Sequence, residues 1–318
     1  MIYIYSKSSA EKSTEDVIDW LNFYEAEFER INGSDLVNNF SYRINNRHVG
    51  TENDIVWFRR WYDSGEITNK LTDVNLRNKN FANLFRNVSS ELKIVSDFFW
   101  RKFKNCRWLT YPHELANDKL EVLEAATMCG LTIPDTIITT SKRDLIEFRK
   151  KSKRIISKLM SNAAPSYSLN EYFVALYTSE ITDDILDSIP DNFFPSLFQE
   201  LIRKQYEIRI FFLEGNLYPM AIFSQNDKQT QVDFRNYNHS KPNRNVPYKL
   251  PDEIESKIKL LIKKLKLTTG SIDIIKSQQE DYIFLEINPV GQFGMTSRPC
   301  NYYLEKEIAE YLIKANKN

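Results

Sequence analysis

The stretch D-Y-I-F-L-E-I-N-P-V-G-Q-F-G, residues 281–294, sets two polar side chains into an apolar run. Residues 283–287 are rich in β-forming side chains, so the run predicts a buried strand. Glu286 and Asn288 lie two residues apart, and side chains alternate between the faces of a strand, so both point to one face. A proline and two glycines follow and indicate a shaped loop rather than a plain sheet edge.

A second β-rich run, S-I-D-I-I at residues 271–275, carries Asp273 at its centre. If the two strands are antiparallel neighbours, Asp273, Glu286 and Asn288 share a surface. Burying two carboxylates without compensation is costly, and three oxygen ligands without His or Cys suit Mg²⁺. The pattern therefore predicts a magnesium site completed by phosphate and water, although an exposed sheet face with ordinary polar residues would show the same pattern.

The composition limits the class of protein. A chain of 318 residues can bury a sizeable core, and we expect two or three subdomains. The 43 basic and 43 acidic residues balance, so we expect neither a nucleic-acid nor a membrane partner. Three widely spaced cysteines, with no metal-binding pattern, predict reduced thiols in the cytoplasm. No G-x-G-x-x-G or Walker A motif is present, which argues against a glycine-rich phosphate loop.

Cations stand at two places where the chain is otherwise apolar. Arg59 and Arg60 follow the predicted strand 55–58, at the strand end where α/β sheets bind ligands. Their planar forks suit a carboxylate or phosphate, but a surface pair bonded to nearby acids fits equally well. Lys158 lies in the predicted strand 154–160 and needs an anionic partner, which is either a phosphate or an internal acid.

The remaining elements are expected from periodicity and turn residues. Asn117-Asp118-Lys119 begins a helix that Gly130 ends. Glu207 and Arg209 share one face of a predicted strand, and Asp233-Phe-Arg235 lies in a polar stretch that is either an active-site loop or a surface insertion. We also expect a helix capped by Ser13, strands at 37–40 and 42–44, and helices at 81–100, 252–265 and 305–314.

Several motifs occur together in a fixed order. They are V-W-F-R-R (56–60), N-D-K-L-x-x-L-x-x-A (117–126), G-L-T-I-P-D-T-I-I-T (130–139), F-Q-E-L-I-x-K-x-x-E-I-R (198–209), D-F-R (233–235) and E-I-N-P-V-G-Q-F-G (286–294). In this order and spacing the chain resembles the ATP-grasp ligases, and more narrowly the graspetide synthetases of the grasp-with-spasm type, which close rings in ribosomal peptides. The resemblance implies an α/β (α+β) ATP-grasp fold with an N-terminal domain (1–115), a central subdomain (116–190) and a C-terminal subdomain (191–318).

The resemblance also implies roles for individual residues. Lys119 and Lys158 match the lysines that hold ATP phosphates, while Glu200, Leu201 and Ile202 match the segment that contacts adenine. Glu207 matches the acid that binds the ribose, Arg209 the arginine near the γ-phosphate, and Asp273, Glu286 and Asn288 the Mg²⁺ ligands. Arg59, Arg60 and Arg235 are candidates for holding the peptide carboxylate. The loop after Lys158 lacks the glycines often found over the phosphates, so its closure on ATP is open.

The implied reaction joins side chains of a precursor peptide that has a leader and a core. ATP would activate an Asp or Glu as an acyl phosphate, and a Ser, Thr or Lys would attack it to form an ester or amide ring. A ligase that adds amino acids to a protein or a small metabolite shares every nucleotide residue and remains an alternative. A catalytically idle nucleotide-binding or peptide-docking module is a further alternative, and self-association as a homodimer is left open.

Overall fold

The computed structural model describes residues 1–8, 11–44, 50–62, 64–72, 81–112, 118–160, 166–169, 172–175, 178–225, 240 and 242–317. The chain divides into two units, the first formed by Met1–Ala116 with Pro289–Asn318 and the second by Asn117–Asn288. The three-part division expected from the sequence stays a prediction. None of the helices in the described ranges is long and apolar enough to cross a membrane.

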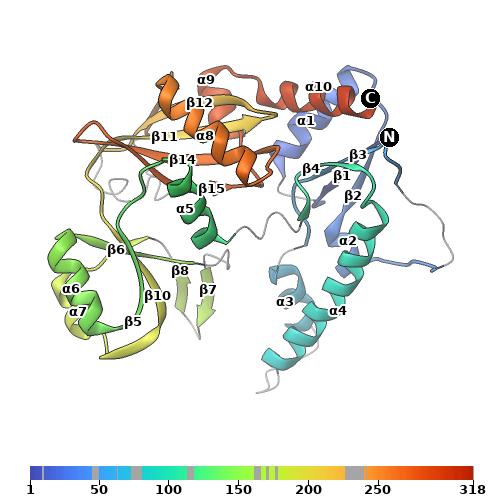
Figure 1. The fold of residues 1–318 in the computed structure, drawn as a ribbon. Coiled ribbons are helices and arrows are strands. Elements are labelled where there is room, and N and C mark those ends of the chain that lie inside the picture. The colour runs from blue at the N-terminus through green and yellow to red at the C-terminus, as the bar shows by residue number, and fades with distance from the viewer. Residues whose placement is uncertain are drawn as a thin grey trace. The chain divides into compact units, whose positions relative to one another are not determined.

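A parallel sheet in the order β2-β1-β3-β4 forms the centre of the first unit (Figure 1). Its strands are β1 (Ile2–Ser6), β2 (Phe28–Asn32), β3 (Ile55–Phe58) and β4 (Arg107–Leu109). Every residue of β1 and β3 is buried, as expected for central strands of a parallel sheet that is covered on both faces. The strand expected at residues 55–58 is therefore confirmed.

Helices pack around this sheet. They are α1 (Lys12–Phe23), α2 (Gly33–Asn38), α3 (Ser64–Thr72), α4 (Phe81–Lys102), α9 (Gly294–Cys300) and α10 (Leu304–Lys317). Helix α10 packs against α1 and contacts β1 and β3, so the end of the chain covers the sheet built by its beginning. Helix α1 has Glu11, not the expected Ser13, at its N-cap, and no side chain caps it.

The strand expected at residues 37–40 is wrong, because Val37 and Asn38 complete the short helix α2. Asn39 donates its backbone N–H to Asp35, and the Asn38 amide donates to the carbonyl oxygen of Ser34. Such short-range bonds favour a local turn over an extended chain. No strand forms at Tyr42–Ile44 either.

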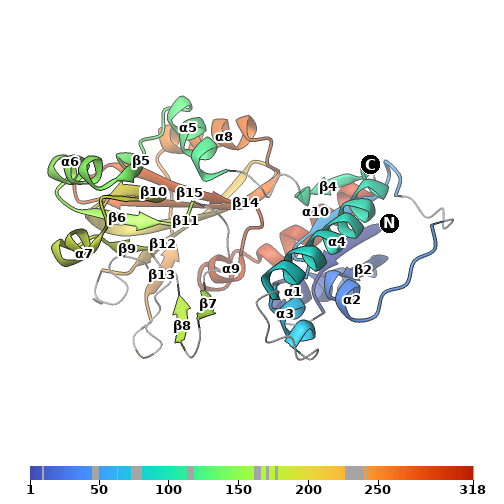
Figure 2. The ribbon, with the colours of Figure 1, turned by 90° about the horizontal axis from the view of Figure 1, so that it is seen from below.

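The second unit contains two larger antiparallel sheets and a hairpin. The first sheet has the order β5-β10-β6-β9, with β5 (Thr136–Ser141), β10 (Asn192–Glu200), β6 (Ile155–Lys158) and β9 (Ser179–Glu180). Helices α6 (Lys142–Ser152) and α7 (Asp183–Ser188) cover it through a shared apolar cluster that includes Leu145, Leu186 and Phe198 (Figure 2). The hairpin pairs β7 (Ser166–Leu169) with β8 (Tyr172–Ala175).

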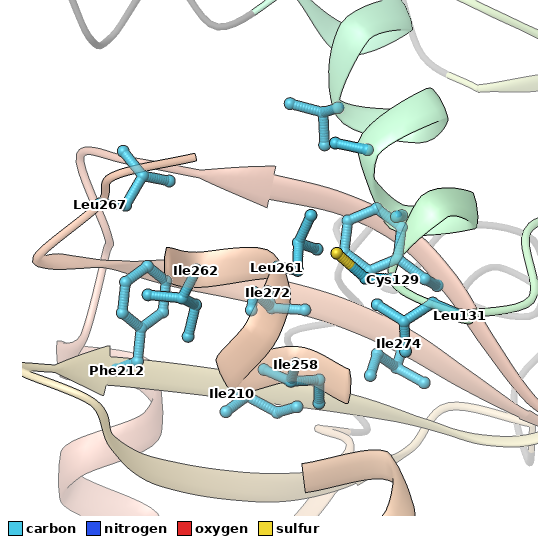
Figure 3. Packing of buried hydrophobic residues seen from close by; sticks show 14 of the residues in the cluster. Cys129, Leu131, Ile210, Phe212, Ile258, Leu261, Ile262, Leu267, Ile272 and Ile274 are labelled. Atoms are coloured by element: carbon cyan, nitrogen blue, oxygen red, sulfur yellow. The ribbon is translucent and has the colours of Figure 1, made fainter. Parts of the chain in front are cut away.

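The other sheet has the order β13-β12-β11-β14-β15 and positions most of the expected site residues. Its strands are β11 (Lys204–Leu213), β12 (Asn216–Phe223), β13 (Arg244–Pro247), β14 (Thr269–Ser277) and β15 (Tyr282–Asn288). Helices α5 (Lys119–Met128) and α8 (Asp252–Lys264) pack on one face (Figure 3). Strand β13 occupies part of the polar stretch expected to be a loop, while Asp233-Phe-Arg235 lies outside the described residues.

Candidate active site

The five-stranded sheet has an apolar face and a polar face. Ile208 and Ile210 of β11 and Ile272 and Phe284 of the neighbouring strands pack against α5 and α8. Because strand side chains alternate, the residues between them point the other way. That opposite face carries Glu207, Arg209, Asp273, Glu286 and Asn288.

Strand register brings the three expected metal ligands onto this polar face. Asp273 pairs with Glu286, and Ser271, two residues before Asp273, pairs with Asn288. The antiparallel pairing expected from the sequence is confirmed. The register shifts between Asp273 and Ile274, so that Leu285 has no paired residue on β14. The Asp273–Glu286 pair itself is kept.

Arg209 forms an ion pair with Asp273 across β11 and β14. Its Nη1 lies 2.9 and 3.0 Å from the two carboxylate oxygens of Asp273. The side chains are only 7% and 15% exposed, so solvent screens this pair weakly. The Nε of Arg209 is buried and has no hydrogen-bond acceptor among the described residues. The guanidinium can therefore accept a further anionic partner.

The donors on this face fit magnesium in kind. Asp273 and Glu286 are half-buried, whereas Asn288 is exposed, and all three offer oxygen. In the ranges that the structure describes, no group of three or more His, Cys, Asp or Glu side chains is placed to hold a metal ion. Two carboxylates and an amide match an ion that draws its other ligands from phosphate and water, as Mg²⁺ does.

The two lysines expected to bind phosphate, Lys119 and Lys158, meet near the end of β6. Lys119 begins α5, where the Asp118 side chain caps the helix by accepting the Leu120 N–H. The Lys119 ammonium donates to the backbone oxygen of Leu159 at 3.1 Å, directly after Lys158 at the end of β6. The fold thus brings two cations to the same strand end. Their contact with phosphate stays a prediction.

The expected adenine segment, Glu200 to Ile202, begins with the last residue of β10. The Glu200 N–H donates to the backbone oxygen of Asp135, and the Leu201 N–H donates to that of Arg154, both at 2.9 Å. These two donors are used by the fold. A purine base at this segment would therefore be recognised through the Ile202 N–H and the backbone carbonyl groups.

The Glu207 side chain is buried, and its carboxylate has two polar partners that the sequence did not predict. Its side chain is 9% exposed, Lys204 Nζ lies 2.5 Å from one carboxylate oxygen, and Ser224 Oγ donates to the other at 2.8 Å. Burial raises the pKa of the Glu207 carboxyl, whereas Lys204 and Ser224 oppose that shift. Lys204 precedes Glu207 by three residues, so the sequence alone could have indicated this ion pair. Ser224 lies near Glu207 because β11 and β12 pair as a hairpin, which the sequence spacing does not indicate.

The two adjacent arginines of the first unit have different surroundings. Arg59 is 2% exposed, donates from Nη1 to the backbone oxygens of Val290 and Gly291, and lies 5.4 Å from the ring centroids of both Trp57 and Phe293. Burial lowers its pKa to about 10.

Arg60 is 37% exposed and pairs with Glu11 at 3.0 Å. Of the expected peptide-binding arginines, Arg60 is therefore the one seen at the surface, while Arg235 lies outside the described residues. A role for Arg59, Arg60 or Arg235 in peptide binding stays a prediction.

Comparison with known proteins gives no match to a protein-family model and no match to a curated protein. Solved structures do match over the full chain. The macrocyclase MdnC from Microcystis aeruginosa MRC, bound with its precursor peptide MdnA, is 24% identical with a TM-score of 0.79, and the match covers 99% of this chain and 100% of MdnC.

Two further structures match in the same way. A RiPP-associated ATP-grasp ligase from Chryseobacterium gregarium, in complex with ADP and a leader and core peptide, is 21% identical with a TM-score of 0.77, covering 98% of this chain and 95% of its own. The ATP-grasp ligase PsnB, complexed with a minimal precursor, Mg and ADP, is 14% identical with a TM-score of 0.77, covering 99% and 97%. The chain therefore has the α/β ATP-grasp fold that its sequence predicts.

Proposed function

We propose that this chain is an ATP- and Mg²⁺-dependent ligase that closes rings in a ribosomally made precursor peptide. The polar face that carries Arg209, Asp273 and Glu286 is the observation on which the proposal depends, because it gathers a cation and two carboxylates in a place where solvent screens them weakly. The full-length similarity to a macrocyclase bound with a precursor peptide, and to a ligase in complex with a leader and core peptide, supports a peptide with a leader and a core as the substrate.

The reaction takes two steps. A peptide carboxylate is a poor electrophile, so one of its oxygens first attacks the γ-phosphorus of ATP, and ADP leaves with the electrons of the broken P–O bond. A hydroxyl of Ser or Thr, or an amine of Lys, then attacks the acyl carbon. The acyl C–O bond breaks, phosphate leaves, and the attacking group loses its proton, so each ring removes one water from the peptide.

The chain's own cations assist the first step by position and charge. Lys119 and Lys158 would hold the phosphates, and Arg209 would neutralise charge on the transferring group. Magnesium bound by Asp273, Glu286 and Asn288 would supply further neutralisation at the phosphate oxygens. Glu200 to Ile202 would hold the base through backbone groups, and Arg59, Arg60 and Arg235 are the candidates for orienting the peptide.

The free cysteines of the chain fit a cytoplasmic enzyme. Cys106, Cys129 and Cys300 are free and buried, and free thiols persist in reducing compartments. Self-association as a homodimer remains a further prediction that the oligomeric state in solution would test.

Co-expression with a peptide encoded beside this gene tests the proposal. The peptide should bear acidic residues and Ser, Thr or Lys acceptors, and its intact mass should fall by one water per ring. An unchanged mass under ATP turnover contradicts the proposal. A mass gain equal to added amino-acid residues would instead favour the alternative ligase.

A further inference from the structure

A lysine, a glutamate and a serine form a closed polar cluster at the start of β11. Lys204 Nζ lies 2.5 Å from Glu207 Oε1, and Ser224 Oγ donates to Glu207 Oε2 at 2.8 Å. All three residues are buried, and Ser224 is fully so. The cluster therefore fixes both oxygens of one carboxylate away from bulk water.

Such a cluster is not an obvious source of stability. Removing two opposite charges from water costs about as much as their attraction returns, and well-packed apolar residues of similar size often do better. Burial acts against the ionised carboxylate of Glu207, and the nearby Asp273 adds to that effect. Only the neighbouring Lys204 and Ser224 act in the other direction. A carboxylate kept in this setting is more readily explained by a function than by packing.

The resemblance to ATP-grasp ligases implies that Glu207 binds the ribose, and the hydrogen-bonding capacity of its carboxylate fits that role. An ionised carboxylate only accepts, and it has about four lone-pair sites. Among the described residues, Lys204 and Ser224 take one on each oxygen, so with respect to these residues about two remain, one on each oxygen. Two adjacent hydroxyl groups, as on the 2′ and 3′ carbons of a ribose, supply two donors at matching separation.

The position of the cluster agrees with this ligand. Lys204 follows Ile202 by two residues, so the cluster comes directly after the segment that we expect to hold the base. Arg203, between them, accepts the Gln278 N–H at 2.9 Å, which ties this part of the chain to the β14–β15 turn. Arg209 lies on the same face as Glu207, two residues further toward the proposed phosphate site.

We propose that Lys204 is a positioning residue that, with Ser224, orients the Glu207 carboxylate to receive both ribose hydroxyls, so that the enzyme selects ribonucleotides over 2′-deoxyribonucleotides. This inference rests on the proposed function, because it assumes that the site binds ATP and releases ADP. It assigns roles to two residues, Lys204 and Ser224, that do not touch the nucleotide in our account.

The test compares the affinities of the folded protein for ADP and for 2′-deoxy-ADP by calorimetry in the presence of Mg²⁺. In the wild type, loss of a hydroxyl that donates to a charged acceptor should weaken binding by about tenfold or more. In Lys204→Met, the ratio of the two dissociation constants should fall to within about threefold of unity. Most of that change should come from weaker ADP binding.

Two further variants make the test specific. Lys276→Met removes another buried lysine, on the adjacent strand β14, whose ammonium contacts Glu280 and the Tyr282 ring and not Glu207. It should keep the wild-type ratio. Ser224→Ala removes the second holder of Glu207 with little change in volume and should lower the ratio in part, so the proposal stays testable if Lys204→Met fails to fold.

The outcomes distinguish failure of the positioning role of Lys204 from failure of the proposed ligase function. A wild-type ratio in folded Lys204→Met and Ser224→Ala, or a wild-type ratio near unity, overturns the positioning role while leaving peptide cyclisation untouched. A wild type that binds no ADP at all contradicts the proposed function itself, and the inference fails with it.

Discussion

Arg209 and Asp273 face each other across adjacent antiparallel strands, with Arg209 Nη1 2.9 and 3.0 Å from the two carboxylate oxygens of Asp273. Asp273 is also one of the three proposed Mg²⁺ ligands. The guanidinium and the proposed metal would therefore share one carboxylate. Asp273 would then hold the Arg209 guanidinium beside the phosphates, and no second acidic residue would be needed to position it.

Replacing Arg209 with Met should lower peptide cyclisation by about a hundredfold, the usual loss when one electrostatic stabiliser of a transition state is removed. The Mg²⁺ dependence of AMPPNP binding should persist, because Asp273 keeps its oxygens. Steady-state rates and calorimetry measure the two effects. Arg107→Met is a control at an exposed arginine that donates to the backbone oxygen of Ala315 and lies outside the proposed site. Unchanged turnover in the Arg209 variant would contradict its role.

Glu286→Gln should keep the fold, because Glu286 is only half-buried and the amide has the same size. It removes one of two anionic ligands, and a loss of about 3–4 kcal/mol of charge stabilisation corresponds to a drop in turnover of about two to three orders of magnitude. Thermal unfolding checks the fold, and peptide cyclisation with increasing Mg²⁺ checks the site. Recovery of near-normal rates at saturating Mg²⁺ would show that Glu286 is not a metal ligand.

Lys158→Ala should weaken AMPPNP binding more than peptide binding, because its charge is assigned to phosphate. The Lys158 side chain is half-buried at the end of β6, where the Lys119 ammonium also lies. Lys142→Ala, which removes another half-buried lysine whose ammonium donates to the Asp187 backbone oxygen, provides the control. If calorimetry finds equal AMPPNP affinity in wild type and Lys158→Ala, Lys158 is part of an internal ion pair instead.

Arg59→Ala and Arg60→Ala should have different effects. Arg59 is buried against Val290 and Gly291, so its loss leaves backbone oxygens without a donor and should cost about 2–5 kcal/mol of stability. Arg60 pairs with Glu11 at a partly exposed site, and its loss should cost at most about 1 kcal/mol.

Thermal unfolding measures the stability of each variant, and cyclisation of the candidate peptide measures function. A stable Arg60→Ala protein that binds AMPPNP but no longer cyclises peptide would support peptide binding by Arg60. If that variant cyclises peptide at the wild-type rate, Arg235 becomes the better candidate for contacting the peptide carboxylate.

The sequence predicts the polar face well because the signal there is local and periodic. Alternation along β14 and β15 places Asp273 and Glu286 on the face opposite the apolar residues of the core. Antiparallel pairing then sets the two carboxylates beside each other. Ser224 gives no such signal, since it reaches Glu207 only through the register of the β11–β12 hairpin.

Other features depend on packing between distant segments. Arg59 and Arg60 are equivalent by position after β3, and contacts with Val290, Gly291 and Phe293, far along the chain, bury Arg59. In α2, apolar and β-forming residues near Val37 suggested a strand, but backbone and side-chain hydrogen bonds within four residues gave a helix. Local propensity alone could not decide either case.

Oxygen transfer from the peptide carboxylate tests the central claim most directly. A candidate precursor labelled with ¹⁸O in its Asp and Glu side chains would be incubated with the enzyme, ATP and Mg²⁺, and the peptide, phosphate and nucleotide analysed by mass spectrometry. Formation of an acyl phosphate predicts one labelled oxygen in each phosphate released, no label in water, and a peptide mass that falls by one ¹⁸O and two hydrogens per ring. Label in AMP, or phosphate released without label while rings form, would contradict activation of the carboxylate by the γ-phosphate of ATP.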